Sequence, residues 1–310
     1  MKNKYIYMVT LSLLTAIFGS CSNEETANSD TGVLRIRTDN VVTRSVITDT
    51  ILSKGDQIGV FAMNTNNNEY ATGSSNMQAV TNDGTNWSFS SATTHLTSAE
   101  AKVYAYYPYA ANNTLHKVSV NIRPSYSSGQ SDYLYGASIN NVNIDNPEAK
   151  IKFKFALSRI TFKITKSKDN VNDELMISNI KLSNVYDSTS ISTNGYMDIL
   201  TGDIAKTKNT NDSVYDATSA YLSENDSKAH FANLLVIPTV VNSNVLLSMT
   251  INNKVFTVHI PNITWLKGCQ YTYPVTFTKT EKSSGQLILG TCIINPWVNN
   301  NENGIICHSY

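Results

Sequence analysis

The side chain that is best placed to do chemistry in this sequence is the thiol of Cys21. It ends an N-terminal segment that starts with lysines, continues with an apolar stretch at residues 5–18 and closes with the small residues Gly19 and Ser20. Such a segment is typical of a secretory signal, and it is too short to span a bilayer, which takes about 20 apolar residues. We therefore predict a signal peptide at residues 1–20, cleavage between Ser20 and Cys21, and a lipid on the Cys21 thiol. The alternative is an ordinary signal peptide in which Cys21 has no role.

The segment after the cysteine, residues 21–31, is polar. It carries Glu24 and Glu25 near its start and no apolar side chain large enough to pack, so we expect a flexible tether. It resembles the acidic tag that follows the lipid-bearing cysteine in some surface lipoproteins, and the alternative is a solvated linker.

Three further cysteines, Cys269, Cys292 and Cys307, lie in the last part of the chain. No two of them form a C-x-x-C motif, so a metal or redox site is not expected. In an exported protein two of them can form a disulfide, and proximity in the sequence favours Cys292 with Cys307. Buried free thiols are the alternative for at least one of the three.

The sequence contains no catalytic motif. The five histidines are scattered singly, and no H-E-x-x-H, G-x-S-x-G or glycine-rich phosphate-binding motif occurs. We therefore expect no enzymatic activity, no metal and no cofactor. The formal net charge is +0, which gives no reason to expect nucleic acid as a partner. Charged residues make up 15%, against about 25% in ordinary soluble domains, and the excess of Asn, Ser and Thr is typical of exported β-rich proteins.

Alternation of apolar and polar residues is the dominant pattern of the chain. It is strict at residues 150–155, 159–164, 256–260 and 271–278. A period of two predicts strands with one buried and one exposed face, as in antiparallel sheets. The apolar positions change from odd to even numbers between the first two segments, which predicts a bulge or kink near Ser158.

The predicted strands fall into two groups, separated by a polar, turn-rich stretch at residues 140–147. We predict an all-β fold of two tandem antiparallel β-sandwiches, residues 32–147 and 148–280, followed by a C-terminal strand and tail at residues 281–310. Residues 118–122 are expected to form a strand of the first sandwich.

A run of tyrosines at residues 104–109 (YAYYPY) has two interpretations. If the rings were exposed, they would form a flat platform for a carbohydrate. The alternative, which we favour, is that the rings pack in and around the core with their hydroxyl groups at its edge.

Four motifs occur in order along the chain: GDQIGVFA at residues 55–62, YAYYPY at 104–109, DYLYG at 132–136 and FALSRITF at 155–162. Together they resemble the successive signatures of the fimbrillin family. The resemblance implies two transthyretin-like β-sandwich domains in a surface-exposed lipoprotein of the outer membrane. It would be anchored by the lipid on Cys21 and would polymerise with other subunits into a thin pilus. The rival, from a different class, is a monomeric surface lipoprotein that binds glycans of a host surface through its tyrosines.

The resemblance also implies an assembly mechanism. A first strand at residues 34–38 is followed by Arg44 and Ser45, and an Arg-specific protease would cut between these two residues. Loss of the strand would leave a groove that a strand of the next subunit fills. The alternative is that Arg44 is an ordinary loop arginine.

The strand that fills the groove is predicted at the C-terminus. Leu287, Leu289 and Ile293 follow a polar spacer in an apolar segment. The alternative is that they form the last strand of their own domain.

Overall fold

The computed structural model describes residues 32–38, 52–91, 94–125, 129–279, 285–297 and 307. The predicted signal-cleavage and lipidation site at Ser20 and Cys21 lies outside these residues, as does the predicted protease site at Arg44 and Ser45. Within the described ranges, no helix reaches the length and hydrophobicity that a membrane crossing requires.

The described part of the chain is built from strands. Its only helical elements are two short 3-10 helices, η1 (Lys168–Asn170) and η2 (Asp226–Lys228). The predicted all-β class is therefore confirmed. The alternation in the sequence becomes alternation of burial, because a strand turns successive side chains to opposite faces. In β20 (Cys269–Thr278), every odd-numbered residue is buried and every even-numbered residue is partly exposed.

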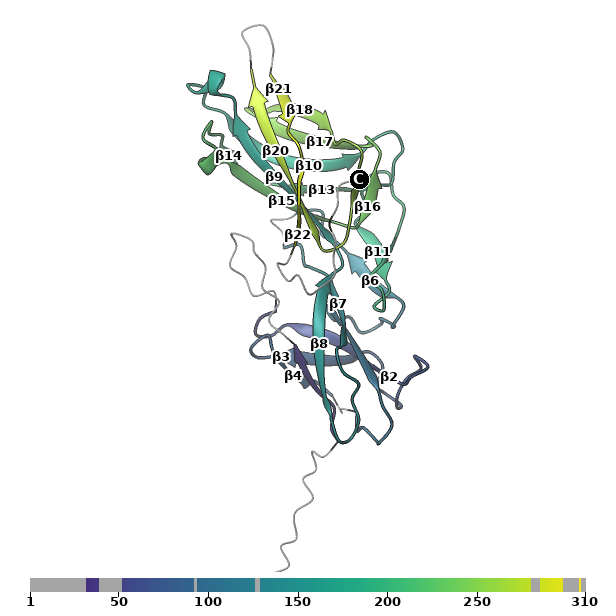
Figure 1. Ribbon diagram of the computed structural model, residues 1–310. Helices are drawn as coiled ribbons and strands as arrows, with labels where there is room; N and C mark the ends of the chain where they lie inside the picture. Colours follow the sequence, from purple (N-terminus) through teal and green to yellow (C-terminus); the bar gives the residue numbers. More distant parts are fainter. Residues whose placement is uncertain are drawn as a thin grey trace, which may run out of the picture. The chain divides into compact units, whose positions relative to one another are not determined.

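One group of strands closes into a barrel in the order β1-β4-β3-β2-β5-β7-β8. Figure 1 labels β2, β3, β4, β7 and β8 of this group. Its members are β1 (Arg35–Thr38), β2 (Gln57–Met63), β3 (Met77–Thr81), β4 (Asn86–Phe89), β5 (Lys102–Tyr107), β7 (Leu134–Ser138) and β8 (Glu148–Phe155). Neighbouring strands in this ring run antiparallel, except that β1 and β8 run parallel. β1 therefore closes the ring between β4 and β8.

The second group consists of two larger sheets. One has the order β13-β10-β17-β18, with β14 also paired to β10, and the other has the order β15-β9-β20-β21, with β22 also paired to β20. Their members are β9 (Ser158–Lys166), β10 (Met176–Asn184), β13 (Ser213–Asp216), β14 (Ala220–Tyr221), β15 (His230–Val236), β17 (Val245–Ile251), β18 (Lys254–His259), β20, β21 (Gln286–Leu289) and β22 (Ile293–Pro296). β9 and β20 lie side by side and run parallel (Figure 1).

Two small sheets complete the described fold. They have the orders β12-β11-β6 and β16-β19. Their members are β6 (Val118–Asn121), β11 (Asn194–Met197), β12 (Ile204–Lys206), β16 (Thr239–Val241) and β19 (Ile263–Trp265).

The strand pairing differs from the predicted division at residue 147 in two places. β8, which we assigned to the second sandwich, pairs with β7 and β1 in the barrel. β6, which we assigned to the first sandwich, pairs with β11 of the second half. The phase change near Ser158 is where the chain passes from β8 to β9, through the buried residues Ala156 and Leu157. It therefore separates two sheets and is not a bulge within one.

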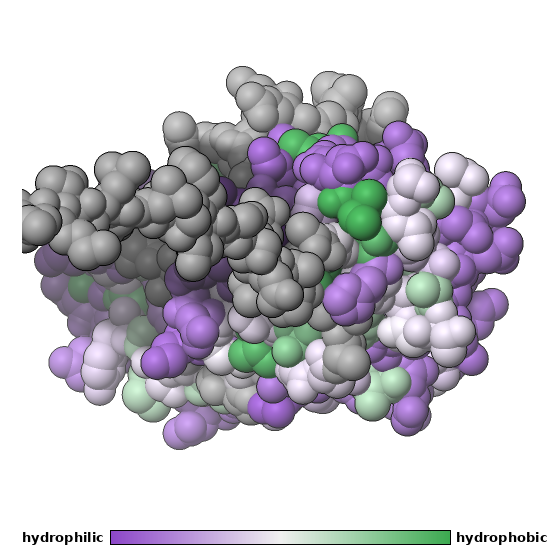
Figure 2. All heavy atoms as spheres, turned by 90° about the horizontal axis from the view of Figure 1, so that it is seen from below, coloured by the Kyte–Doolittle hydropathy of each residue, from purple (hydrophilic) through white to green (hydrophobic). Residues whose placement is uncertain are grey.

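The interior holds large apolar side chains, and the surface is mainly polar. Phe61, Tyr106, Phe162 and Trp265 are among the largest fully buried residues. On the face shown in Figure 2, most coloured residues are hydrophilic or weakly polar, and hydrophobic residues form small separate spots. This division agrees with a sequence that uses Asn, Ser and Thr in place of many charged residues.

Candidate functional site

The predicted first strand is present as β1, and both of its edges are paired. It runs parallel to β8 and antiparallel to β4, where Ile36 lies opposite Trp87. The pairing continues before the strand, since Leu34 N donates to Thr94 O at 3.0 Å. β1 is therefore an inner strand of the barrel.

The side chains of β1 and the preceding residue alternate between core and solvent. Leu34, Ile36 and Thr38 are 1%, 3% and 0% exposed. Arg35 and Arg37, between them, are exposed. The predicted alternation is thus confirmed. Burial of Leu34 and Ile36 stabilises the barrel by roughly 1.5–3 kcal/mol for each side chain.

A buried polar contact holds the end of β1 against β4. Trp87 Nε1 donates to Thr38 Oγ1 at 2.9 Å, and Thr38 Oγ1 donates to Gly84 O at 2.9 Å. The backbone N–H of Thr38 donates to Thr85 O at 2.8 Å. Without β1, the Trp87 indole and the Gly84 carbonyl would lose these partners, at a cost of about 1–3 kcal/mol for each group that stays buried.

Loss of β1 would open the barrel along β4 and β8. Two strand edges with unpaired N–H and C=O groups would face one another across an apolar core, which is the arrangement that accepts a strand from another chain. A strand that replaced β1 would need apolar side chains at alternate positions, as Leu34 and Ile36 have. An exchange of this kind would need no catalytic group.

The predicted donor residues lie in the sheet of their own chain. Leu287 and Leu289 belong to β21, and Ile293 begins β22; both strands pair with β20. Leu287 is 7% exposed and Leu289 is half-buried, whereas Ile293 is 54% exposed, so the three side chains do not share one face. In this state the C-terminal segment forms the edge of its own sheet, which is the alternative interpretation of these residues.

Pro274 in β20 explains why this edge is divided into two strands. Gly290 N donates to Pro274 O at 2.8 Å. The N and O atoms of a residue in a strand point to the same edge, so the missing N–H of Pro274 faces the C-terminal segment. Because proline cannot donate to a neighbouring strand, the ladder is interrupted at residues 290–292.

The predicted disulfide between Cys292 and Cys307 is wrong. Cys307 pairs with Cys269, and Cys292 is a free thiol. The sheet register gives the reason: β22 runs antiparallel to β20, so the chain at Pro296 has come back to Cys269, while Cys292 lies farther along β20, near Tyr273. Burial raises the pKa of the Cys292 thiol to about 11, which keeps it protonated.

The tyrosines of β5 pack against the protein. Tyr106 is 0% exposed, and its hydroxyl lies 2.7 Å from Asn76 Oδ1 and accepts from Asn113 Nδ2 at 3.1 Å. Burial raises the pKa of Tyr106. Burial and the nearby Asp56 carboxylate raise the pKa of Tyr107 to about 12. The packing interpretation is confirmed for Tyr106, which cannot belong to an exposed carbohydrate platform.

We expect Tyr106→Phe to destabilise the protein by about 1–2 kcal/mol, because it removes a hydroxyl from Asn113, which is buried, and from Asn76, which is partly buried. The free energy of unfolding in urea measures this loss. Tyr186→Phe is the matched control, because Tyr186 is 80% exposed, and it should change stability by less than about 0.5 kcal/mol. Equal effects of the two substitutions would show that the Tyr106 hydroxyl contributes nothing specific.

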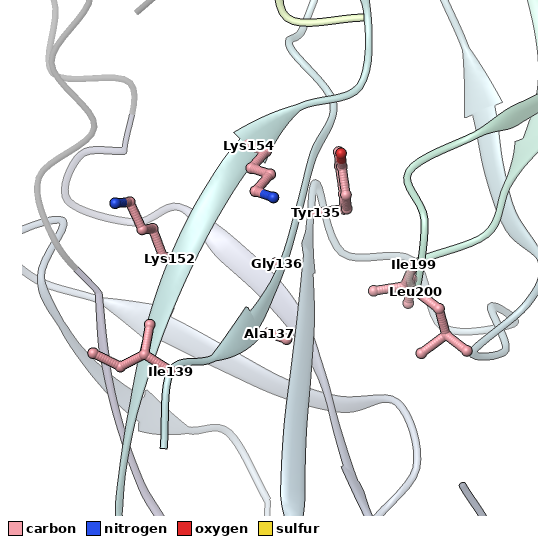
Figure 3. A pocket seen from close by; sticks show the side chains of 8 residues that line it. All are labelled: Tyr135, Gly136, Ala137, Ile139, Lys152, Lys154, Ile199 and Leu200. Carbon is pink, nitrogen blue, oxygen red and sulfur yellow. The ribbon is translucent and has the colours of Figure 1, made fainter. Parts of the chain in front are cut away.

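A groove with a volume of about 280 Å³ lies beside β7 and β8 (Figure 3). It is lined by Tyr135, Gly136, Ala137, Ile139, Lys152, Lys154, Ile199 and Leu200. The two lysines lie on the opposite side of the groove from Ile199 and Leu200. Burial, with a further contribution from the Asp203 carboxylate, raises the pKa of Tyr135 to about 12, so its hydroxyl is neutral. The lining has no carboxylate, imidazole or thiol.

A shallower hollow of about 580 Å³ is lined mainly by hydroxyl and amide side chains around Lys206. Lys206 Nζ is already bonded there, to Ser190 O at 3.1 Å and Thr239 Oγ1 at 2.5 Å. In the part of the chain that the structure describes, no group of three His, Cys, Asp or Glu side chains could hold a metal ion.

Comparison with known proteins identifies a family. A sequence model of fimbrillin-like proteins matches residues 43–297, which is most of the chain. No curated protein matches the chain significantly.

Solved structures share the fold. A candidate cell adhesion protein from Bacteroides ovatus is 17% identical, with 87% of this chain and 99% of that chain covered and a TM-score of 0.62. One from Bacteroides uniformis is 17% identical over 86% of this chain and 100% of that chain, with a TM-score of 0.63. A third, from Bacteroides fragilis, is 14% identical, with 87% of this chain and 99% of that chain covered and a TM-score of 0.51. At these identities the likeness concerns the fold alone.

Proposed function

Because the chain belongs to the fimbrillin-like family, we propose that it is a structural, non-enzymatic subunit of a cell-surface pilus, or an accessory or anchor relative of one. The observation that supports this most strongly is the position of β1. It closes a barrel with both edges paired, yet it is a short strand near the start of the chain. Its removal would turn a closed barrel into an acceptor for a strand of another subunit.

The cut that releases β1 lies between Arg44 and Ser45. The other arginines are poor sites in the folded protein, which supports this choice. Arg35 and Arg37 lie in β1, where the backbone is paired on both sides, and Arg159 is 7% exposed in β9. Arg123 is followed by proline, which has no amide N–H.

The precursor is held at the outer surface of the outer membrane by the lipid on Cys21. The lipid lies on the N-terminal side of the cut, so proteolysis releases the subunit and opens its barrel in one step. A strand from a neighbouring subunit then pairs with β4 and β8. A member that keeps its lipid would serve as an anchor.

Digestion of the purified protein with an Arg-specific protease tests the cut. We expect one rapid cleavage, a new N-terminus at Ser45, and loss of the β1 residues when the product is separated in mild denaturant. Mass spectrometry identifies the product. Arg44→Ala should remain intact under the same conditions, whereas Arg123→Ala should be cut like the unmodified protein. Rapid cleavage of Arg44→Ala at another arginine would contradict the proposed site.

A further inference from the structure

The disulfide between Cys269 and Cys307 makes the C-terminal segment a closed loop. Cys269 is the first residue of β20, and Cys307 follows it by 38 residues with the two Cα atoms 5.9 Å apart. β20, β21 and β22 all lie inside this loop. To pair with another subunit, the segment with β21 and β22 would have to detach from β20. Both ends of that segment are connected to β20, one through the chain and the other through the disulfide.

The sheet around β20 depends on the same segment. β21 and β22 cover one edge of β20, and β9 covers the other. Detachment would leave the first edge unpaired and would expose Leu287, which is buried. The subunit would open an edge of its own sheet in order to fill the barrel of a neighbour.

Trp297 adds a second anchor next to β22. It is 4% exposed, its ring stacks on Phe155 with centroids 4.2 Å apart, and its backbone N donates to Gly268 O at 2.8 Å. The Arg159 guanidinium lies 6.0 Å from the centre of the same ring. The chain is thus packed where it leaves β22 and covalently held at Cys307.

From these contacts we infer that this chain accepts a strand but keeps its own C-terminal strands while the Cys269–Cys307 disulfide is intact. The inference rests on the proposed function and specifies it further. An oxidised subunit stands at the end of a fibre, and the strand that fills its barrel comes from a chain with a free C-terminal segment. Reduction of the disulfide releases β21 and β22 for donation, with two thiols formed and two electrons supplied by a dithiol reductant.

Hydrogen exchange on the intact chain tests, independently of assembly, whether the disulfide holds β21 and β22 on β20. We expect Cys307→Ser to speed exchange of the amides at residues 286–296 by roughly tenfold or more, because local opening no longer has to occur inside a closed loop. Peptides from β2 and β5 should exchange as before. Cys292→Ser is the matched control, since Cys292 is free. Because its half-buried thiol contacts Tyr273, any change should stay next to residue 292 and well below tenfold. Reduction of the folded, unmodified protein should reproduce the effect of Cys307→Ser. Unchanged exchange after both treatments would overturn the inference that the disulfide holds these strands in place.

Assembly of the protein cut at Arg44 tests its consequence. With the disulfide intact, the cut protein should capture a peptide with the sequence of residues 32–38 but should not polymerise by itself, whereas cut Cys307→Ser should polymerise. Polymers of the oxidised protein joined through residues 286–296 would overturn the inference. Failure to capture the peptide in either redox state would instead overturn the proposed function. The exchange measurement would still decide whether the disulfide holds β21 and β22 on β20.

Discussion

A protein that begins at Ser45 is expected to be less stable than the protein with β1 by about 3–6 kcal/mol. The estimate counts only the burial of Leu34 and Ile36, at roughly 1.5–3 kcal/mol each. Loss of the Thr38 contacts with Trp87 and Gly84 acts in the same direction. Urea denaturation of the two proteins, followed by fluorescence, measures the difference.

A peptide with the sequence of residues 32–38 should restore much of this stability, because it binds only the folded state, and the gain should rise with the logarithm of its concentration above its Kd. The control peptide carries Ile36→Asp, which would place a charge in the core, and it should restore nothing. A second peptide with Arg37→Asp keeps the apolar face and should restore stability like the natural sequence, because Arg37 is exposed. If the protein that begins at Ser45 were as stable as the longer one, or if the three peptides acted alike, β1 would not be an exchangeable strand.

Trp297→Ala is expected to cost about 3–5 kcal/mol, the usual range for truncation of a buried large aromatic residue. The substitution removes the ring that stacks on Phe155 and leaves a cavity beside the end of β22. Because β22 loses its anchor, residues 286–296 should also exchange their amide hydrogens faster. Urea denaturation gives the first quantity, and hydrogen exchange gives the second.

Trp297→Phe is the matched control. Among the described residues, the indole N–H of Trp297 has no hydrogen-bond partner, so its removal breaks no hydrogen bond in that part of the chain. A phenyl ring keeps the stacking on Phe155, and we expect a loss below about 1.5 kcal/mol. If the alanine and phenylalanine variants were equally stable, the stacked ring would not anchor the C-terminal segment.

The positions and faces of several strands could be predicted from the sequence because alternation is a local property. The inward residues of β20 and the apolar side chains of Leu34 and Ile36 are examples. The pairing partners could not be predicted, because they depend on residues far apart in the chain. β1 lies parallel to β8, and β9 lies parallel to β20, although the pattern was interpreted as antiparallel throughout.

Two features carried a signal that was interpreted wrongly. The change of phase between Phe155 and Ile160 was visible, but it marks the passage between two sheets. Cys269 has the same parity as Tyr271 and Tyr273, so the alternation indicates a buried side chain there, whereas proximity in the sequence indicates only Cys292 as the partner of Cys307.

The contacts that complete the site carried no local signal. Thr38 and Trp87 are 49 residues apart, and neither belongs to a recognisable motif. Only the closure of the barrel brings the hydroxyl and the indole together. The stacking of Trp297 on Phe155 depends in the same way on the complete fold.

The central claim is that β1 is replaced by a strand of another subunit, and the structure of an assembled fibre by cryo-electron microscopy tests it most directly. The account predicts that each subunit that has accepted a strand begins at Ser45, and that this strand comes from a different chain and lies between β4 and β8, with apolar side chains at the positions of Leu34 and Ile36. It would be contradicted by fibres whose subunits still carry their own β1 between β4 and β8.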